Sequence, residues 1–343
     1  MIKMEKNPIK QRKEINLGIS ILRVILSFMV VMDHLYNTEK FSDYLYILYY
    51  HIPTFFVISF YYTYKTLISF DIPKLKLRYQ RLLIPYVSYS IIGWILNNIH
   101  FYIFKKDCSH SLKDFLHNLL NGHIFNVALW FQINLIVITT LFIIVIFIFK
   151  NYHLSVLNII CILTYIFQYS GANYHFFRKY FTPHYTLSLG RLSENFPNAL
   201  IGFFLASTNI VEQLNHKNGK TIFYSLIILI IITKYKLFHE LLGYKYGGIR
   251  NNIAAICIFL IFLLLPCQKV NIKIKKVINQ MTKYTGGIYL SHYLIGKGIL
   301  IELIIYIKNK TLFGCIIVYC ISYITCCLGT KLLGKTIFRH LFA

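Results

Sequence analysis

The chain has 343 residues, of which 57% are apolar and only 14% are charged. An ordinary soluble domain carries roughly 25% charged residues, so this composition excludes a water-soluble globule. The 36 lysines and arginines outnumber the 12 acidic residues and give a net charge of +24. In a soluble protein that excess would suggest nucleic acid, but here the basic residues are scattered between apolar runs. We therefore expect no nucleic-acid partner and attribute much of the basicity to contact with anionic membrane lipids.

The first apolar stretch, residues 17–36, follows a basic N-terminal segment and superficially looks like a signal peptide. It is about twenty residues long, contains Arg23 and lacks a small-x-small cleavage site. We interpret it as a retained first membrane span.

The later apolar runs predict further spans. A helix that crosses the ~30 Å hydrocarbon core needs roughly twenty residues, which predicts an all-α integral membrane protein with a bundle of about ten transmembrane helices. The expected helices are 17–36, 46–66, 82–104, 127–149, 154–170, 192–208, 220–234, 251–267, 285–306 and 311–330. Those between 150 and 270 are the shortest, and a re-entrant or tilted segment in place of one of them stays an open alternative.

Orientation follows from the basic residues, because Lys and Arg in short loops stay in the cytoplasm. Placing the N-terminus inside leaves more of them on cytoplasmic than on external segments. We therefore expect a multi-pass protein of the cell membrane with both termini cytoplasmic. No repeat or linker divides the chain, so 1–343 is interpreted as one domain, with a basic N-terminus 1–16, transmembrane helices 17–330 and a tail 331–343. The basic run 269–283 is interpreted as a cytoplasmic topology signal.

The cysteines and histidines do not predict a metal site. Most of the eight cysteines lie inside apolar runs, and no two of them have the spacing of a zinc or thioredoxin motif. The thirteen histidines form no His-Glu-x-x-His motif. We expect no metal.

Ionisable side chains within the predicted spans are the candidates for chemistry, because each costs about 2.5–3.5 kcal/mol to insert into a bilayer. They are Arg23, Asp33, His34, Glu194, His292, Lys297 and Glu302.

Arg23 and His34 share one face of the first span. Their spacing of eleven residues returns to within about 20° of the same direction and separates them by roughly 16 Å along the helix axis. This places Arg23 in the inner half and His34 near the outer boundary. Asp33 points ~100° away from His34, so we do not expect it to orient that histidine. A purely structural alternative is that Arg23 snorkels and His34 sits at the interface.

Arg78 and Arg81 are expected just before the third span, on the cytoplasmic side. Arginines at positions i and i+3 are neighbours on a helix surface and offer two guanidinium forks that suit phosphate. The alternative is a stop-transfer cluster that only fixes topology.

The Arg–His pair of the first span and the Arg78–Arg81 pair occur along the chain together with several aromatic and Pro-containing motifs. The motifs are Arg-x10-His at 23–34, the aromatic segment 51–59, Arg-x-x-Arg at 78–81, the Arg-Leu-Leu-Ile-Pro-Tyr segment 81–86, Leu-Trp-Phe at 129–131 and Gly-Ile-Tyr-Leu-Ser-His at 287–292. Together they resemble the membrane acyltransferase-3 family over nearly the whole chain. Two departures are Ser-Phe-Tyr at 59–61, where the family usually has Ser-Gly-Phe, and Tyr-Thr-Gly at 284–286, which replaces a Ser-Tyr pair.

The resemblance implies transfer of an acyl group, most often acetyl, from cytoplasmic acyl-CoA to a hydroxyl of a cell-surface or lipid-linked glycan. In that reading acetyl-CoA is the expected donor, and Arg78 and Arg81 hold its phosphates at the cytoplasmic mouth. His34 would act as the general base. Arg23 would either polarise the thioester carbonyl or organise the tunnel beneath His34, and the sequence does not decide between these roles.

A different class of protein stays open as an alternative. A polysaccharide exporter or flippase would use Arg23, Glu194, Lys297 and Glu302 to line a substrate or proton path. No inverted repeat is visible, and Lys297 and Glu302 would point in divergent directions on one helix. A membrane assembly protein without catalysis would leave Arg23 and His34 unexplained.

Cysteine labelling tests the predicted topology. A cysteine at Asn37, in the segment 37–45 expected outside, should react with an impermeant reagent added to intact cells. A cysteine at Lys76 should react only after permeabilisation, because it is expected to face the cytoplasm. The unmodified chain gives the background from its own eight cysteines. The reverse pattern would exchange the donor and acceptor sides.

Overall fold

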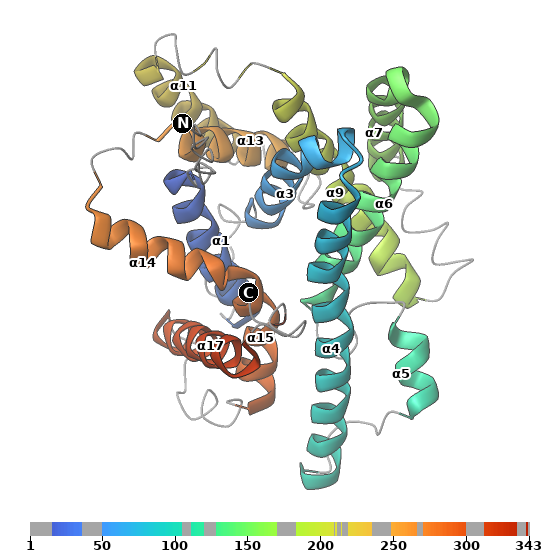
Figure 1. The fold of residues 1–343 in the computed structure, drawn as a ribbon, viewed down its shortest axis with the longest axis vertical. Helices are drawn as coiled ribbons and strands as arrows, with labels where there is room; N and C mark the ends of the chain where they lie inside the picture. The colour runs from blue at the N-terminus through green and yellow to red at the C-terminus, as the bar shows by residue number, and fades with distance from the viewer. Residues whose placement is uncertain are drawn as a thin grey trace, which may run out of the picture.

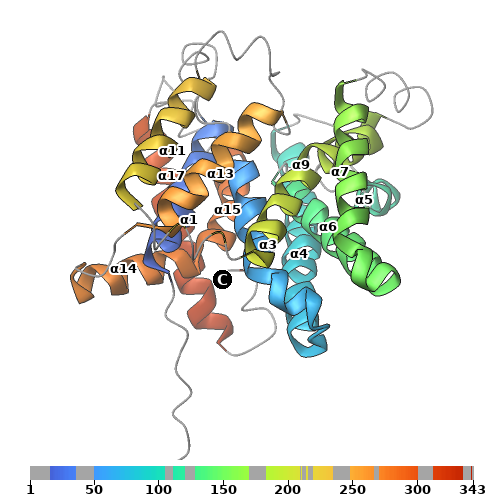
Figure 2. The same cartoon turned by 90° about the horizontal axis from the view of Figure 1, so that it is seen from above.

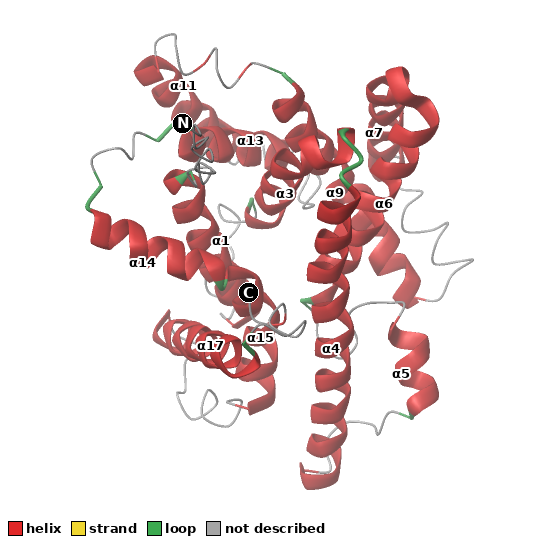
Figure 3. Ribbon diagram, in the orientation of Figure 1, coloured by secondary structure: helices red, strands yellow, loops and turns green. Residues whose placement is uncertain are grey.

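All regular structure in the residues described by the computed structural model is helical, with no strand among them (Figure 3). The described residues are 16–35, 50–104, 111–119, 128–169, 183–208, 210, 214, 219–234, 248–265, 270–299, 312–334 and 341. The helices are α1 (Leu17–Leu35), α3 (His51–Ile68), α4 (Ile72–Phe104), α5 (Leu112–Leu119), α6 (Leu129–Phe149), the 3-10 turn η2 (Lys150–Tyr152), α7 (His153–Tyr169), α9 (Pro183–Ser207), α11 (Gly219–Lys234), α13 (Ile249–Leu263), α14 (Ile272–Lys283), α15 (Thr285–Tyr293), the π-helical η3 (Leu294–Ile299) and α17 (Leu312–Leu333) (Figure 1).

Four helical stretches in the described part of the chain are long and apolar enough to cross a membrane. They are Leu17–Leu35, Ile72–Ile99, Leu129–Ile166 and Leu312–Leu333, and a shorter apolar helix covers Asn251–Leu263. The regular structure of the described residues thus consists only of helices, several of which suit a membrane, whereas a bundle of ten spanning helices is not confirmed. Parts of the predicted spans lie outside the described residues.

Helices α1 and α3 connect two halves of the bundle. α1 packs against α13, α14, α15 and α17, and α3 packs against α4, α6 and α9 as well as against α1 and α13. Figures 1 and 2 show α14, α15 and α17 on the side of α1 and α4 to α7 on the other side. The α3 half is filled by aromatic side chains, of which Phe56, Phe60, Phe142 and Phe203 are fully buried. The two halves face each other across the candidate site.

The third span is longer than predicted, because α4 begins at Ile72 and not near residue 82. Asp71 caps it, since its Oδ1 accepts a hydrogen bond of 3.2 Å from the backbone N–H of Lys74. Asp is a favoured residue at this position. The first turns of α4 are polar, so a reading by hydropathy starts the helix too late. Arg78 and Arg81 therefore lie within α4 and not ahead of the helix.

A helix not predicted from the sequence, α14, occupies most of the basic run that was interpreted as a topology signal. Asn271 caps its N-terminus, since the Oδ1 of Asn271 accepts a hydrogen bond of 2.8 Å from the backbone N–H of Lys273. Its composition is too polar for a span, but its apolar residues recur at helical spacing. Ile274 and Val277 are exposed on that apolar face, a pattern typical of helices that lie along a membrane surface.

The contact between α3 and α9 depends on a glycine. A Cβ at Gly202 would overlap the backbone carbonyl of Val57 in α3. The two helices can approach this closely only because glycine has no side chain. Gly314 of α17 provides a contrast, since nothing lies within 4 Å of a Cβ placed there.

Gly202→Ala should therefore lower the free energy of unfolding by about 1–3 kcal/mol, because the added methyl forces the two helices apart. Gly314→Ala is the matched control and should be neutral or stabilising by about 0.5–1 kcal/mol. Thermal unfolding of both variants in detergent measures the difference. Equal melting temperatures would contradict the close contact of α3 with α9.

Candidate active site

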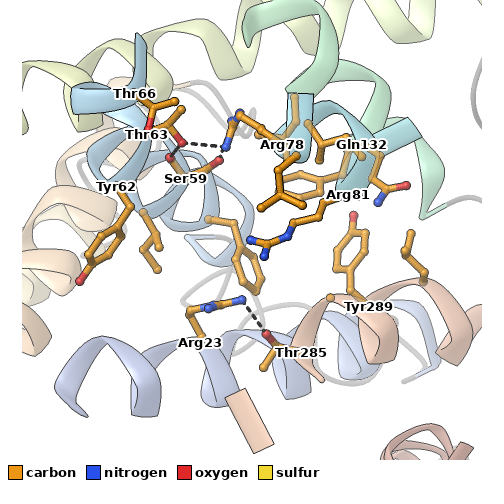
Figure 4. Close-up of a pocket in the computed structure, with 18 of the residues that line it drawn as sticks. Arg23, Ser59, Tyr62, Thr63, Thr66, Arg78, Arg81, Gln132, Thr285 and Tyr289 are labelled. Atoms are coloured by element: carbon orange, nitrogen blue, oxygen red, sulfur yellow. Dashed lines mark hydrogen bonds between the residues drawn. The ribbon is translucent and has the colours of Figure 1, made fainter. Parts of the chain in front are cut away.

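A cavity of about 520 Å³ lies between α1, α3, α4, α6 and α15 (Figure 4). Its volume is in the usual range of ligand pockets, roughly 300–1,000 Å³. Four basic side chains line it, namely Arg23, Lys74, Arg78 and Arg81, and no residue in its described lining is acidic. Lys74 forms an ion pair with Asp71. The three arginines have no carboxylate among the described lining residues.

Arg78 is held by hydroxyl groups from two other helices. Its guanidinium donates hydrogen bonds to Thr63 at 2.7 Å and to Ser59 at 3.0 Å, both in α3. It also donates to Thr139 of α6, at 3.1 Å from Nη2. Its Cζ lies 5.4 Å from the centroid of the Phe60 ring. These neutral partners fix the orientation of the guanidinium but do not neutralise its charge.

Arg81 and Arg23 face each other across the cavity, with the Arg81 guanidinium between those of Arg78 and Arg23 (Figure 4). Arg23 Nη2 donates a hydrogen bond of 3.1 Å to Thr285 Oγ1, and this hydroxyl donates to the carbonyl oxygen of Thr282 at 3.0 Å. Arg81 makes no hydrogen bond or ion pair with any residue that the structure describes. Its charge also repels that of Arg23. Arg81 is thus the guanidinium most available to a ligand.

This arrangement favours an anionic ligand. Two unit charges 4 Å apart interact by about 4 kcal/mol at an effective dielectric constant near 20, so three nearby arginines repel one another and attract an anion. Guanidinium groups also bind phosphate through two parallel hydrogen bonds. The charge of the cavity therefore suits an anionic molecule, and Arg81 is the guanidinium most open to it.

An aromatic cluster forms another part of the cavity wall. The rings of Phe55, Phe131 and Tyr289 come from α3, α6 and α15, and their centroids lie 5.0–6.3 Å apart. All three line the cavity. The Tyr289 ring also lies 6.2 Å from that of His292, which is not a lining residue. Tyr289 therefore separates the arginine cavity from a group of histidines.

His34 belongs to this group of histidines and does not line the cavity. Its ring centroid lies 5.2 Å from that of His292 and 5.9 Å from that of Tyr293. Asp33 Oδ2 lies 3.8 Å from Nε2 of His51 in α3, so this carboxylate pairs with another histidine. The structure thus places His34 with His292 and away from the three arginines.

Of the residues that the sequence singled out, Arg23, Arg78 and Arg81 share one cavity although they come from two helices. Glu194 is partly buried in α9 and is not a lining residue. The side chain of Lys297 and the whole of Glu302 lie outside the described residues. The roles predicted for Arg23, His34, Arg78 and Arg81 stay predictions.

Sequence reasoning missed the neighbours of these residues. Thr285 was noted only as a departure from the family pattern, and His292 only as an ionisable residue within a span. Their separation of seven residues, two helical turns, puts both on one face of α15 and was a usable signal. Nothing in the sequence places that face against α1. In the described residues, no group of three or more His, Cys, Asp or Glu side chains could hold a metal ion.

Comparison with known families identifies the class of protein. The family model for acyltransferase-3, described as an acyltransferase domain, matches residues 16–330. The chain therefore belongs to the acyltransferase-3 family and is a membrane acyltransferase. Comparison with curated proteins gives no match, and neither does comparison with solved structures.

Replacing Arg81 tests whether the cavity binds the acyl donor. In the described structure, Arg81 makes no hydrogen bond that links α4 to another helix, so its loss should not weaken the fold. Arg81→Ala should raise the KM for the acyl donor, which the sequence predicts to be acyl-CoA, by about 10- to 100-fold, since a hydrogen bond to a charged group contributes about 1.5–3 kcal/mol. Arg81→Lys should restore only part of this, because lysine lacks the guanidinium fork. Arg78→Ala should weaken donor use as well and also lower stability, through the loss of its contacts with α3 and α6.

The control for these variants is Lys113→Ala, an exposed basic residue of α5 outside the cavity. All variants are compared at equal amounts of membrane-inserted protein. An unchanged KM in an Arg78→Ala, Arg81→Ala double variant would return the pair to the role of a topology signal.

Proposed function

We propose that the protein is a transmembrane O-acyltransferase. It would move an acyl group, with acetyl-CoA as the expected donor, from the cytoplasm to a hydroxyl of a cell-surface or lipid-linked glycan. Membership of the acyltransferase-3 family supports acyl transfer. The observation that carries the choice of donor is the cavity lined by three arginines without a carboxylate among the described lining residues.

The donor is proposed to bind with its phosphates at Arg78 and Arg81, near the N-terminal end of α4. The phosphates cannot enter the apolar bundle cheaply without these charges. The neutral pantetheine arm would then extend along the apolar wall of the cavity toward Tyr289. This directs the thioester toward His34, which lies about 16 Å from Arg23 along α1. A long, extended donor suits this separation.

The reaction joins the glycan hydroxyl to the acyl group. The hydroxyl oxygen attacks the thioester carbonyl carbon, His34 accepts the hydroxyl proton, and a carbon–oxygen bond forms. The carbon–sulfur bond then breaks, and the sulfur leaves as a thiolate that takes the proton from His34 to give CoA. Histidine suits this task because its pKa in water lies near neutral pH.

Arg23 is proposed to organise the donor cavity. It lies on the same cavity as Arg78 and Arg81 and is oriented by Thr285, whereas His34 lies among other residues. These contacts favour that role over direct polarisation of a carbonyl group at His34. The exporter alternative has less support, because the cavity wall described here carries no acidic group that could relay protons.

Replacing His34 distinguishes the enzyme from the exporter. His34→Ala should remove acyl groups from the surface glycan while the amount of glycan stays the same, because removal of a general base costs about 10²–10⁴-fold in rate. An exporter would behave oppositely, with less glycan outside and unchanged composition. Mass spectrometry of the glycan measures acyl content per repeat alongside total amount. Full acyl content in a well-inserted His34→Ala variant would refute the proposed base.

A further inference from the structure

His292 is a fully buried histidine whose hydrogen bonding is incomplete. Its Nδ1 lies 3.2 Å from the backbone carbonyl oxygen of Ile288, four residues earlier in α15. A carbonyl oxygen can only accept, so Nδ1 carries the proton. In the neutral ring, Nε2 then has a free lone pair, and it makes no hydrogen bond with any residue that the structure describes.

Such an atom needs an explanation. Leaving a buried acceptor without a partner destabilises the folded protein, and most buried polar atoms in native proteins have partners. An apolar side chain of similar volume would avoid this cost. The backbone bond to Ile288 moreover fixes one tautomer of His292. Nε2 is therefore a neutral acceptor held in a defined place.

The ring beside His292 is that of His34. The two imidazole centroids are 5.2 Å apart and their planes are inclined by 32°. At this separation two ring nitrogens can meet at hydrogen-bond distance after a small change in side-chain rotation. Tyr293 packs edge-on against His34, with an interplanar angle of 80°. Asp33 cannot easily replace His292 as the partner, because it points to another side of α1 and pairs with His51.

The backbones of α1 and α15 are held in register along this contact. Thr282, at the end of α14, donates a hydrogen bond of 3.0 Å to the carbonyl oxygen of Ser20. Three residues further along each segment, Arg23 donates a hydrogen bond to Thr285, the first residue of α15. At the far end, a Cβ at Gly296 would lie only 2.7 Å from a methyl carbon of Leu35. The two histidines lie between these points, so their approach follows from the packing of the helices.

We infer that His292 is the positioning residue of His34 in the acyl transfer. After rotation of the two side chains, its Nε2 would accept a hydrogen bond from one N–H of His34. The other ring nitrogen of His34 is then unprotonated and takes the proton of the glycan hydroxyl. His292 stays neutral throughout, while the proton passes from the hydroxyl to His34 and then to the leaving sulfur. A carboxylate has the same orienting role in serine hydrolases. This inference rests on the proposed function of His34.

The test compares three substitutions of His292 in the full-length protein in detergent or nanodiscs. His292→Leu removes the acceptor, His292→Gln returns an oxygen near the position of Nε2, and His292→Asn reaches only the position of Nδ1. The kcat of His292→Leu should fall at least about tenfold, yet less than the ~10⁴-fold that loss of an orienting carboxylate costs. Its KM for acyl-CoA should stay unchanged, because the arginines of the cavity are intact.

Rescue separates positioning from packing. His292→Gln should keep several-fold more activity than His292→Leu and His292→Asn, although all three fill the site imperfectly. If His292→Leu does not insert, the comparison of Gln with Asn still decides. The control is His153→Leu, at the start of α7. The ring of His153 contacts that of Phe203 in α9 and belongs to neither the cavity nor the group around His34. Its kcat should equal that of the wild type.

Two results would overturn the inference. One is a wild-type kcat in a well-inserted His292→Leu variant, and the other is equal activity of the Gln and Asn variants. The proposed function fails separately, through retention of acyl transfer in His34→Ala. If His34→Ala is inactive while every His292 variant is fully active, the enzyme and its base stand and only the role of His292 falls.

Discussion

The candidate site depends on positive charge gathered in an apolar bundle without a carboxylate in the described cavity wall. Arginine keeps its proton in proteins, so this charge cannot be removed by titration. Hydroxyl groups and one aromatic ring hold Arg78, and Thr285 holds Arg23, but these contacts orient the guanidiniums without neutralising them. The cavity is therefore poised for an anion. The hydroxyl partners of the arginines and the aromatic wall of the cavity would then orient that anion and its acyl group.

The second determinant is the parallel course of α1 and α15. At one end they bring Arg23 to Thr285 beside the cavity, and at the other they bring His34 to His292. The distance between the two places is set by the rise of an α-helix, about 1.5 Å per residue. The aromatic rings of Phe55, Phe131 and Tyr289 lie at the cavity wall. The fold thus separates the place that attracts anions from the place that suits proton transfer.

Much of the fold could be predicted from the sequence, because a bilayer requires long apolar helices and hydropathy detects them. Hydropathy failed where a helix is polar. It started α4 about ten residues late, although Asp71 is a typical residue at a helix N-terminus. It also missed α14, because the lysines of this helix lower its average hydropathy although one of its faces is apolar. The number of about ten spanning helices stays a prediction, since short apolar segments can cross the bilayer, tilt or lie within the bundle.

The sequence by itself determined that the protein is helical and lies in the membrane, and it singled out Arg23, His34, Arg78 and Arg81, because charge inside apolar segments is costly enough to be conspicuous. Only the tertiary structure decided which of them meet. Helical spacing relates residues on one helix, so it placed Arg23 and His34 on one face of the first span, roughly 16 Å apart. Packing between helices brings Arg23 together with Arg78 and Arg81 from α4, and His34 together with His292 from α15. Contacts between segments far apart in the chain depend on how side chains fit across helix faces, and no local pattern carries that information.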